Sequence, residues 1–385
     1  MKQISALALF FILVPSLFSQ SPITLSDSAT ISLMTVAPGE FVYSTFGHSA
    51  IRVKDPVTRF DRCYNYGTFD FEQPNFLLNF CRGKLLYNLD VESYRSFEYG
   101  NLHDRRPMQE QVFNMNLVQK QRIFDLLQEN YKEENRYYKY DFFYDNCATR
   151  IRDVVQNTFF YQLQLDSTVK ANGVTMRQLL QPYLDEKPWL DFGTDLLLGL
   201  PADHRASISE YMFLPDYMHH VFANAKTGEG KSLIKSERNI PEPPVKKEPF
   251  RPSPLDRPFW VMCFVALIGL LSMANPRTEH IFDTIFWFVL GVAGLVIALL
   301  WFATDHSATK TNLNILWAWP THLLFFWRTR RKGITEHYFT VAALMAALVL
   351  IFWKWMPQEL PTPALPIVAL IVVKGLWRRY WRKEV

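Results

Sequence analysis

Residues 145–155 read DNCATRIRDVV, and this stretch determines how the N-terminal half of the chain can fold. Apolar residues recur after Cys147 at the spacing of one helix face, at positions 148, 151, 154 and 155. Asp145 and Asn146 are both favoured N-cap residues. The stretch therefore predicts a helix that begins at Cys147, with the thiol in its first turn.

Working outward, the flanking sequence predicts a mixture of strands and helices. Alternating or strand-rich patterns occupy residues 31–35, 49–53, 62–68, 85–91 and 111–117. An amphipathic pattern predicts a helix over residues 118–135. Thr175 is expected to cap a short helix that ends at residue 180. We expect this half to form an α+β domain.

The N-terminus has the pattern of a secretory signal. A lysine at position 2 precedes an apolar run over residues 4–18, and small polar residues follow at 19–21. The run is short for a membrane span. Residues 1–19 are therefore predicted to be a signal peptide, and residues 20–240 an exported domain. Leu17 stands where cleavage prefers a small residue, so an uncleaved anchor is the alternative.

A proline-rich linker and a membrane domain are predicted to follow. Seven prolines lie within residues 241–258, a density typical of an extended linker. Residues 259–385 contain five apolar segments, which are residues 259–274, 281–303, 313–327, 338–356 and 364–377. Five spans are expected, although three of these segments are short for a full crossing.

Loop charges predict the orientation of these spans. Clusters of arginine and lysine lie at residues 328–332 and 378–383. The loops 304–312 and 357–363 together contain a single arginine or lysine, which is Lys310. The positive-inside rule then places the C-terminus in the cytoplasm and the exported domain on the other side. The net charge is only +4 and no broad basic face is evident, so nucleic acid is not expected as a partner.

Cys147 and His48 are the candidate catalytic residues. A helix N-terminus favours negative charge, so we expect it to lower the pKa of the Cys147 thiol and to stabilise an oxyanion. His48 would be the base, with Asn65 as its orienting partner and Asp70 as the competitor. The structural alternatives are a buried inert cysteine and an ordinary histidine.

The remaining cysteines and several further histidines suggest no metal site. Cys63 and Cys81 could form a disulfide in an oxidising compartment or remain separate thiols, and Cys263 lies within an apolar run. The other histidines lack metal-ligand spacing, so neither a metal nor a cofactor is predicted. These histidines include His103, His204, His219 and His220.

The order of His48 and then an Asn-Cys pair resembles the circularly permuted papain-like fold of lecithin:retinol acyltransferase. A closer resemblance is to the bacterial Lnb-type lipoprotein N-acyltransferases. It rests on the motifs at residues 47–53, 64–67, 140–142, 145–150 and 192–203, and on Asp305-His306, Asn312 and residues 319–322. Ala148 and Cys81 depart from the expected pattern. The resemblance implies a permuted papain-like periplasmic domain, with an antiparallel sheet and helices, followed by five transmembrane helices.

The resemblance also implies an activity. Cys147 would take an acyl chain from a phospholipid as a thioester and pass it to the α-amino group of a diacylated lipoprotein's N-terminal cysteine, with His48 as base. The protein would then lie in the bacterial inner membrane with its catalytic domain in the periplasm. Candidate substrate-binding or supporting residues are Asn146, Asp145, Arg150, Arg52, Tyr43, Ser44 and His306. The alternatives are a papain-like cell-wall amidase or endopeptidase and a non-catalytic lipid-binding membrane protein.

Overall fold

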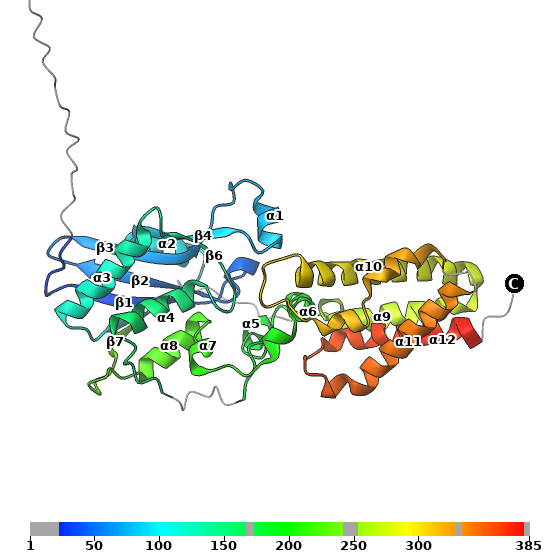
Figure 1. The fold of residues 1–385 in the computed structure, drawn as a ribbon. Coiled ribbons are helices and arrows are strands. Elements are labelled where there is room, and N and C mark those ends of the chain that lie inside the picture. The colour runs from blue at the N-terminus through cyan, green and yellow to red at the C-terminus, as the bar shows by residue number, and fades with distance from the viewer. Residues whose placement is uncertain (1–22, 167–172, 242–252, 329–332, 381–385) are drawn as a thin grey trace, which may run out of the picture.

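The computed structural model describes residues 23–166, 173–241, 253–328 and 333–380. A sheet-containing half and an elongated helical half are joined end to end (Figure 1). The predicted signal peptide, residues 242–252 of the predicted linker and parts of both basic clusters lie outside the described residues. The proposed domain boundaries stay predictions.

The N-terminal half contains a seven-stranded sheet in the order β6-β4-β3-β2-β1-β5-β7, in which every neighbouring pair is antiparallel. The antiparallel α+β prediction is therefore correct. The strands are β1 (Thr30–Val36), β2 (His48–Asp55), β3 (Phe60–Thr68), β4 (Leu86–Ser93), β5 (Met108–Phe113), β6 (Tyr137–Lys139) and β7 (Ile234–Ile240). The fifth predicted strand extended too far, because Asn116 forms a capping box with Gln119 and starts α3.

Helices cover the sheet on both faces. The larger core packs α3 (Leu117–Tyr131), α4 (Cys147–Thr158) and α8 (Pro215–Asn224) against strand residues such as Leu33 and Ile51. The alternate residues of the same strands, such as Met34 and Ala50, pack against α2 (Tyr94–His103) on the opposite face. This two-residue alternation produces two apolar layers from one set of strands. Shorter helices are α1 (Phe76–Cys81), α5 (Gln181–Leu184), α6 (Pro188–Leu197) and α7 (Ile208–Tyr211).

The helix predicted over residues 175–180 is wrong. Thr175 accepts a hydrogen bond from the Gln178 N–H at 3.2 Å, as a cap would, but turns follow it. The N–H groups of Met176 and Arg177 donate to the carbonyls of His204 and Ala202 at 3.2 and 2.8 Å. These bonds tie the segment to a neighbouring loop and leave α5 to begin only at Gln181.

Four α-helices form the C-terminal half. They are α9 (Pro258–Leu271), α10 (Pro276–Phe302), α11 (Ile334–Phe352) and α12 (Leu365–Tyr380). Two stretches, Pro276–Phe302 and Ile334–Trp355, are long and apolar enough to span a membrane, and Pro258–Ala274 and Thr362–Trp377 are shorter apolar helices. The number of membrane spans therefore remains a prediction.

The third predicted span is not an α-helix. It consists of three short 3₁₀ turns, η5 (Leu313–Leu316), η6 (Pro320–Leu324) and η7 (Phe326–Arg328). Pro320 lacks the N–H that a continuous helix would need. The segment runs antiparallel along α10. Leu323 packs against Gly291 of α10, and Ala318 packs against Gly294, where no side chain stands in the way. A Cβ at Gly294 would collide with the Ala318 carbonyl.

The loops of the helical half dock onto the sheet half. Gly199 N–H donates to the Ala308 carbonyl at 2.9 Å, and the Asn312 amide donates to the Leu196 carbonyl at 2.9 Å. Gln358 reaches the Leu198 carbonyl at 3.1 Å. The α6 segment also packs on the core of the helical half. Residues 195–203 therefore form the main joint between the two halves.

Arg177 holds this joint from within. Its guanidinium is buried and pairs with Asp195 and Asp203, each at 2.9 Å. Removal of one member of a buried ion-pair network leaves the other charges uncompensated. Arg177→Leu should therefore destabilise the protein by about 3–5 kcal/mol. Thermal unfolding of the full-length protein in detergent would measure the loss as a lower melting temperature. The exposed Arg205→Leu is the matched control; equal melting temperatures for both variants would contradict the prediction.

Candidate functional site

Asn146 places Cys147 at the first position of α4. Its Oδ1 accepts hydrogen bonds from Ala148 N–H at 2.8 Å and Thr149 N–H at 3.0 Å, and Thr149 Oγ1 accepts from the Asn146 N–H at 2.7 Å. The predicted N-cap is therefore correct for Asn146. The Asn146 Nδ2 group donates to the Phe142 carbonyl at 2.7 Å and to the Phe213 carbonyl at 2.9 Å. All the hydrogen-bonding groups of this buried amide have partners, which holds the helix start in one position.

The Cys147 sulfur faces the start of β2. It lies against the backbone N–H groups of Ser49, Ala148 and Cys147 itself. Gly67 on β3 lies next to Cys147, since a Cβ at that position would be in ordinary contact with the Cys147 Cβ at 3.5 Å, and its φ of +82° favours glycine there. Ser49 directly follows His48, so the thiol and the imidazole come from adjacent parts of the fold. The three N–H groups could also hold a negatively charged oxygen.

A chain of hydrogen bonds runs from His48 through Asn65 to Glu92. His48 Nε2 lies 3.3 Å from Asn65 Oδ1, and Asn65 Nδ2 donates to Glu92 Oε1 at 3.1 Å. Because the Glu92 carboxylate accepts the hydrogen bond from Asn65 Nδ2, the amide oxygen of Asn65 faces the imidazole. The hydrogen of the neutral ring is then placed on Nε2, and Nδ1 is left as the basic nitrogen. Sequence reasoning missed Glu92, which lies 27 positions from Asn65.

Asp70, the competing partner for His48, is engaged in an exposed turn. Its Oδ1 accepts a hydrogen bond from the Glu72 N–H at 2.8 Å.

Desolvation dominates the ionisation of both reacting groups. Burial lowers the pKa of His48 to about 4; the positive charge of Arg106 lowers it further and the Asn65 hydrogen bond opposes the shift. Burial also raises the pKa of the Cys147 thiol above its ordinary value, despite the neighbouring N–H groups and Arg106. The expectation that the helix N-terminus would lower this pKa is therefore wrong, because the cost of burying the thiolate exceeds the local stabilisation. Both groups are neutral at pH 7, as a general base and its proton donor must be.

Arg106 is a second residue that sequence reasoning missed. It lies between α2 and β5, and its charge acts on both His48 and Cys147. An arginine in a polar loop is common, and only the fold brings it close to residues 48 and 147.

The predicted supporting residues occupy different places. Arg150 pairs with Asp145 and lies over the Tyr138 ring at 4.1 Å, so this pair supports the turn that leads into α4. Arg52 pairs with Asp61 and Glu110 and stacks on Tyr94. These contacts place Arg52 on the α2 side of the sheet, where it supports the fold.

Three further candidates and the cysteines can be placed. Ser44 is buried, whereas Tyr43 is exposed and stacks on Phe41 beside the site. The His306 imidazole contacts the carbonyls of Phe80 and Cys81 at 3.0 and 3.2 Å, so it links the helical half to α1. Cys63 is buried and Cys81 exposed, and both are free thiols in this structure, which agrees with the alternative of two separate thiols.

The fold and site together define an α+β protein with an apolar helical half, in which a cysteine at a helix N-terminus lies against the backbone of the residue that follows a buried histidine. Comparison with family models then identifies the particular family. Residues 23–182 match the Lnb N-terminal periplasmic domain, and residues 246–384 match the Lnb transmembrane domain. The chain therefore belongs to the Lnb family and is a membrane protein with a periplasmic domain. Searches of curated proteins and of solved structures found no match.

The two pKa shifts predict how Cys147 reacts with an alkylating agent. With a raised thiol pKa and a lowered imidazole pKa, no thiolate–imidazolium pair forms at neutral pH. The rate of Cys147 alkylation by iodoacetamide should therefore still be rising at pH 9, the ordinary thiol pKa. Mass spectrometry of the Cys147 peptide would measure it, with the exposed Cys81 as an internal reference. A rate that reaches a plateau below pH 7 would contradict this assignment.

Proposed function

We propose that this protein is a lipoprotein N-acyltransferase that uses Cys147 as its nucleophile. The observation that carries the proposal is the arrangement of the Cys147 sulfur against the N–H of Ser49, the residue that directly follows His48, whose imidazole Nε2 lies 3.3 Å from Asn65 Oδ1. A thiol, a neutral base and a group of N–H donors are what a covalent acyl-transfer mechanism requires.

In the first half-reaction, Cys147 takes an acyl chain from a phospholipid. His48 Nδ1 accepts the thiol proton while the sulfur attacks the ester carbonyl. The N–H groups near the sulfur stabilise the oxyanion of the tetrahedral intermediate. The ester C–O bond then breaks, His48 gives its proton to the leaving alkoxide, and the products are a lysophospholipid and an acyl-thioester on Cys147.

In the second half-reaction, the α-amino group of a diacylglyceryl-cysteine attacks the thioester. An α-amino pKa near 8 leaves part of this amine uncharged at neutral pH. His48 takes a proton from the attacking nitrogen as the C–S bond breaks, and the thiolate recovers that proton. The amide is released, and the enzyme returns to its starting state.

Exposed apolar side chains beside the site favour lipid substrates. Phe41 and Tyr43 are 59% and 64% exposed, and they precede His48 by only a few residues. Leu77 on α1 is 71% exposed, and the end of α1 contacts the loop that follows α10 through Asp305 N–H and the Arg82 carbonyl at 2.8 Å. A water-soluble peptide substrate would gain little from such a surface.

We also propose that the protein lies in the inner membrane with its C-terminus in the cytoplasm. Asp305 N–H and Gln358 both contact the periplasmic half, so the loops that contain them lie on its side. The two basic clusters of the sequence then fall on the opposite side, in agreement with the positive-inside rule.

Loss of the thiol should abolish acyl transfer. Cys147→Ala should lower N-acylation of a diacylated lipoprotein by at least about a thousand-fold, because no thioester can form. Mass spectrometry of the lipoprotein N-terminus would detect the missing chain. Cys81→Ser removes an exposed thiol on α1 and serves as the control, with full activity expected. Full activity in Cys147→Ala would refute the nucleophile assignment. A wild-type thioester that reacts only with water would indicate a hydrolase instead.

The hydrogen bonds from His48 to Asn65 and from Asn65 to Glu92 should affect the rate of acyl-enzyme formation, because they set the orientation of the Asn65 amide. Asn65→Ala should slow acyl-enzyme formation by about ten- to a hundred-fold, because the imidazole loses its orienting acceptor. Glu92→Gln keeps an acceptor oxygen for Asn65 Nδ2 and should stay close to wild type, whereas Glu92→Leu allows the amide to flip and should resemble Asn65→Ala. Single-turnover measurement of the thioester by intact mass would compare the three variants. Similar rates for Glu92→Leu and wild type would show that Glu92 has no such role.

A further inference from the structure

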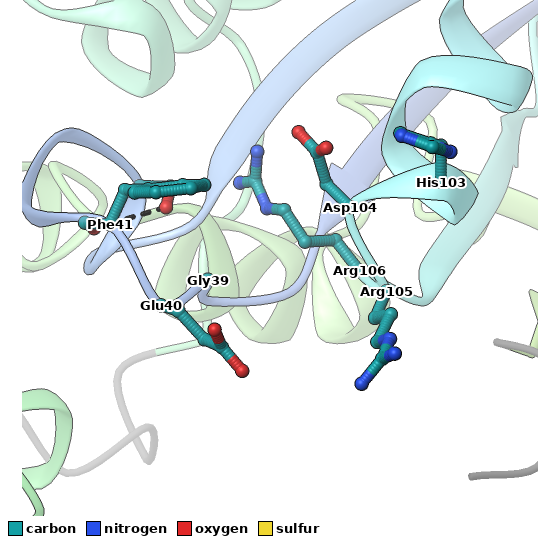
Figure 2. A pocket seen from close by; sticks show the side chains of 8 residues that line it. Gly39, Glu40, Phe41, His103, Asp104, Arg105 and Arg106 are labelled. Atoms are coloured by element: carbon teal, nitrogen blue, oxygen red, sulfur yellow. Dashed lines mark hydrogen bonds between the residues drawn. The ribbon is translucent and has the colours of Figure 1, made fainter.

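A pocket of about 160 Å³ lies between the segment after β1 and the loop after α2. Its lining residues are Gly39, Glu40, Phe41, Ser44, His103, Asp104, Arg105 and Arg106. Figure 2 shows the Arg106 guanidinium between Phe41 and Asp104, with the Arg105 side chain pointing the opposite way. A pocket of this size has room for one small anionic group.

Two contacts hold the Arg106 guanidinium in position. Nε donates to the Ala37 carbonyl at 2.9 Å, and Nη1 contacts Asn101 Oδ1 at a longer 3.4 Å. Burial outweighs the nearby negative charges and lowers the Arg106 pKa from its ordinary value, although the group stays protonated. The side chain is thus partly desolvated and fixed before any ligand arrives.

The Nη2 atom of Arg106 has no protein acceptor. It is buried, and in the described part of the chain it has no hydrogen-bond partner. A charged donor in this condition is costly, and native proteins rarely leave one so. The rim carries Glu40 and Asp104 as well as His103 and Arg105, so its charges nearly balance and only the guanidinium is held at depth.

The place of the pocket in the fold links Arg106 to the candidate catalytic residues. Ser44 lines the pocket, and its carbonyl accepts a hydrogen bond at 3.1 Å from the N–H of Gly47, the residue directly before His48. The charge of Arg106 also acts on the Cys147 thiol and on the His48 imidazole. Phe41 lines the same pocket, and its ring stacks on Tyr43 at 5.5 Å. An anionic group in the pocket would therefore lie between an exposed apolar surface and the nucleophile. A phospholipid matches this arrangement, because its anionic phosphate is close to its acyl esters and its chains are apolar.

We propose that Arg106 Nη2 binds a phosphodiester oxygen of the donor lipid and so positions the acyl ester for Cys147. This inference rests on the proposed acyl transfer and names Arg106 as a substrate-positioning residue. Arginine forms charge-assisted hydrogen bonds with phosphate oxygens, and loss of such a bond typically weakens binding by about ten- to a hundred-fold.

The test compares charged and uncharged acyl donors with the full-length protein in detergent micelles. The donors are phosphatidylglycerol and diacylglycerol with the same chains, and the readout is kcat/KM for acyl-enzyme formation. Arg106→Gln should lose about ten- to a hundred-fold with phosphatidylglycerol, mainly through KM, and change little with diacylglycerol. Arg106→Lys should recover part of the loss. Arg95→Gln removes an exposed arginine from α2 and should behave as wild type. Equal losses with both donors would overturn the proposal, since the guanidinium would then serve the thiol or the fold.

A binding measurement separates this proposal from the proposed activity. Cys147→Ala protein, with and without Arg106→Gln, is titrated with a dialkyl ether phosphatidylglycerol and with the matching dialkylglycerol, neither of which has an ester to cleave. Native mass spectrometry should show that Arg106→Gln weakens binding of the phospholipid alone. This result would support the phosphate site even if no acyl transfer occurs. Inorganic phosphate should compete poorly, because it lacks the chains that contact Phe41 and Tyr43. Complete competition at equal concentration would overturn the assignment to a lipid phosphate.

Discussion

The buried side chain of Asn146 is the constraint on which the rest of the site depends. One amide caps α4 through two N–H groups, and it ties the helix start to the Phe142 and Phe213 carbonyls. These bonds join the turn before the helix, the helix itself and the segment before α8. Because α4 packs on the sheet, its start is brought against β2, where His48 begins the strand. The capping interaction and the packing of α4 on the sheet therefore bring the Cys147 thiol against the backbone of Ser49, next to His48 in the chain.

Most of the N-terminal fold could be predicted because its signals are local. Alternation in β1 to β4 and the apolar face of α3 and α4 appear within single segments. The pairing of β7 with β5 was not predictable, because it joins Ile240 to Met108 across 132 positions and the strand itself is largely polar. The segment after Thr175 shows the opposite failure: a local cap signal was present, but backbone bonds to Ala202 and His204 replaced the helix. Tertiary contacts decided both outcomes.

At the candidate site, the sequence indicated which residues to consider but not their protonation states. Cys147, His48 and Asn65 could be proposed from residue type and pattern. The pKa of Cys147 could not, because a helix N-terminus and burial act in opposite directions and only the structure gives the extent of burial. Glu92 and Arg106 carry no sequence signal of their own. Glu92 acts through Asn65, and Arg106 lies on the loop between α2 and β5, so each acquires a role only when the strands assemble.

The helical half contacts the turn that leads into α4 and Cys147. Ser307 Oγ donates to Asp141 Oδ2, and Asp305 lies 3.4 Å from Lys139. Asp141 is also paired through its backbone with Asp145, directly before the Asn146 cap. A continuous set of contacts thus connects the loop after α10 to the start of α4. Backbone hydrogen bonds between Asp141 and Asp145 close the 141–145 turn, so this turn joins the loop after α10 to the residue before the Asn146 cap. Contacts from the helical half therefore support the segment that leads to Cys147.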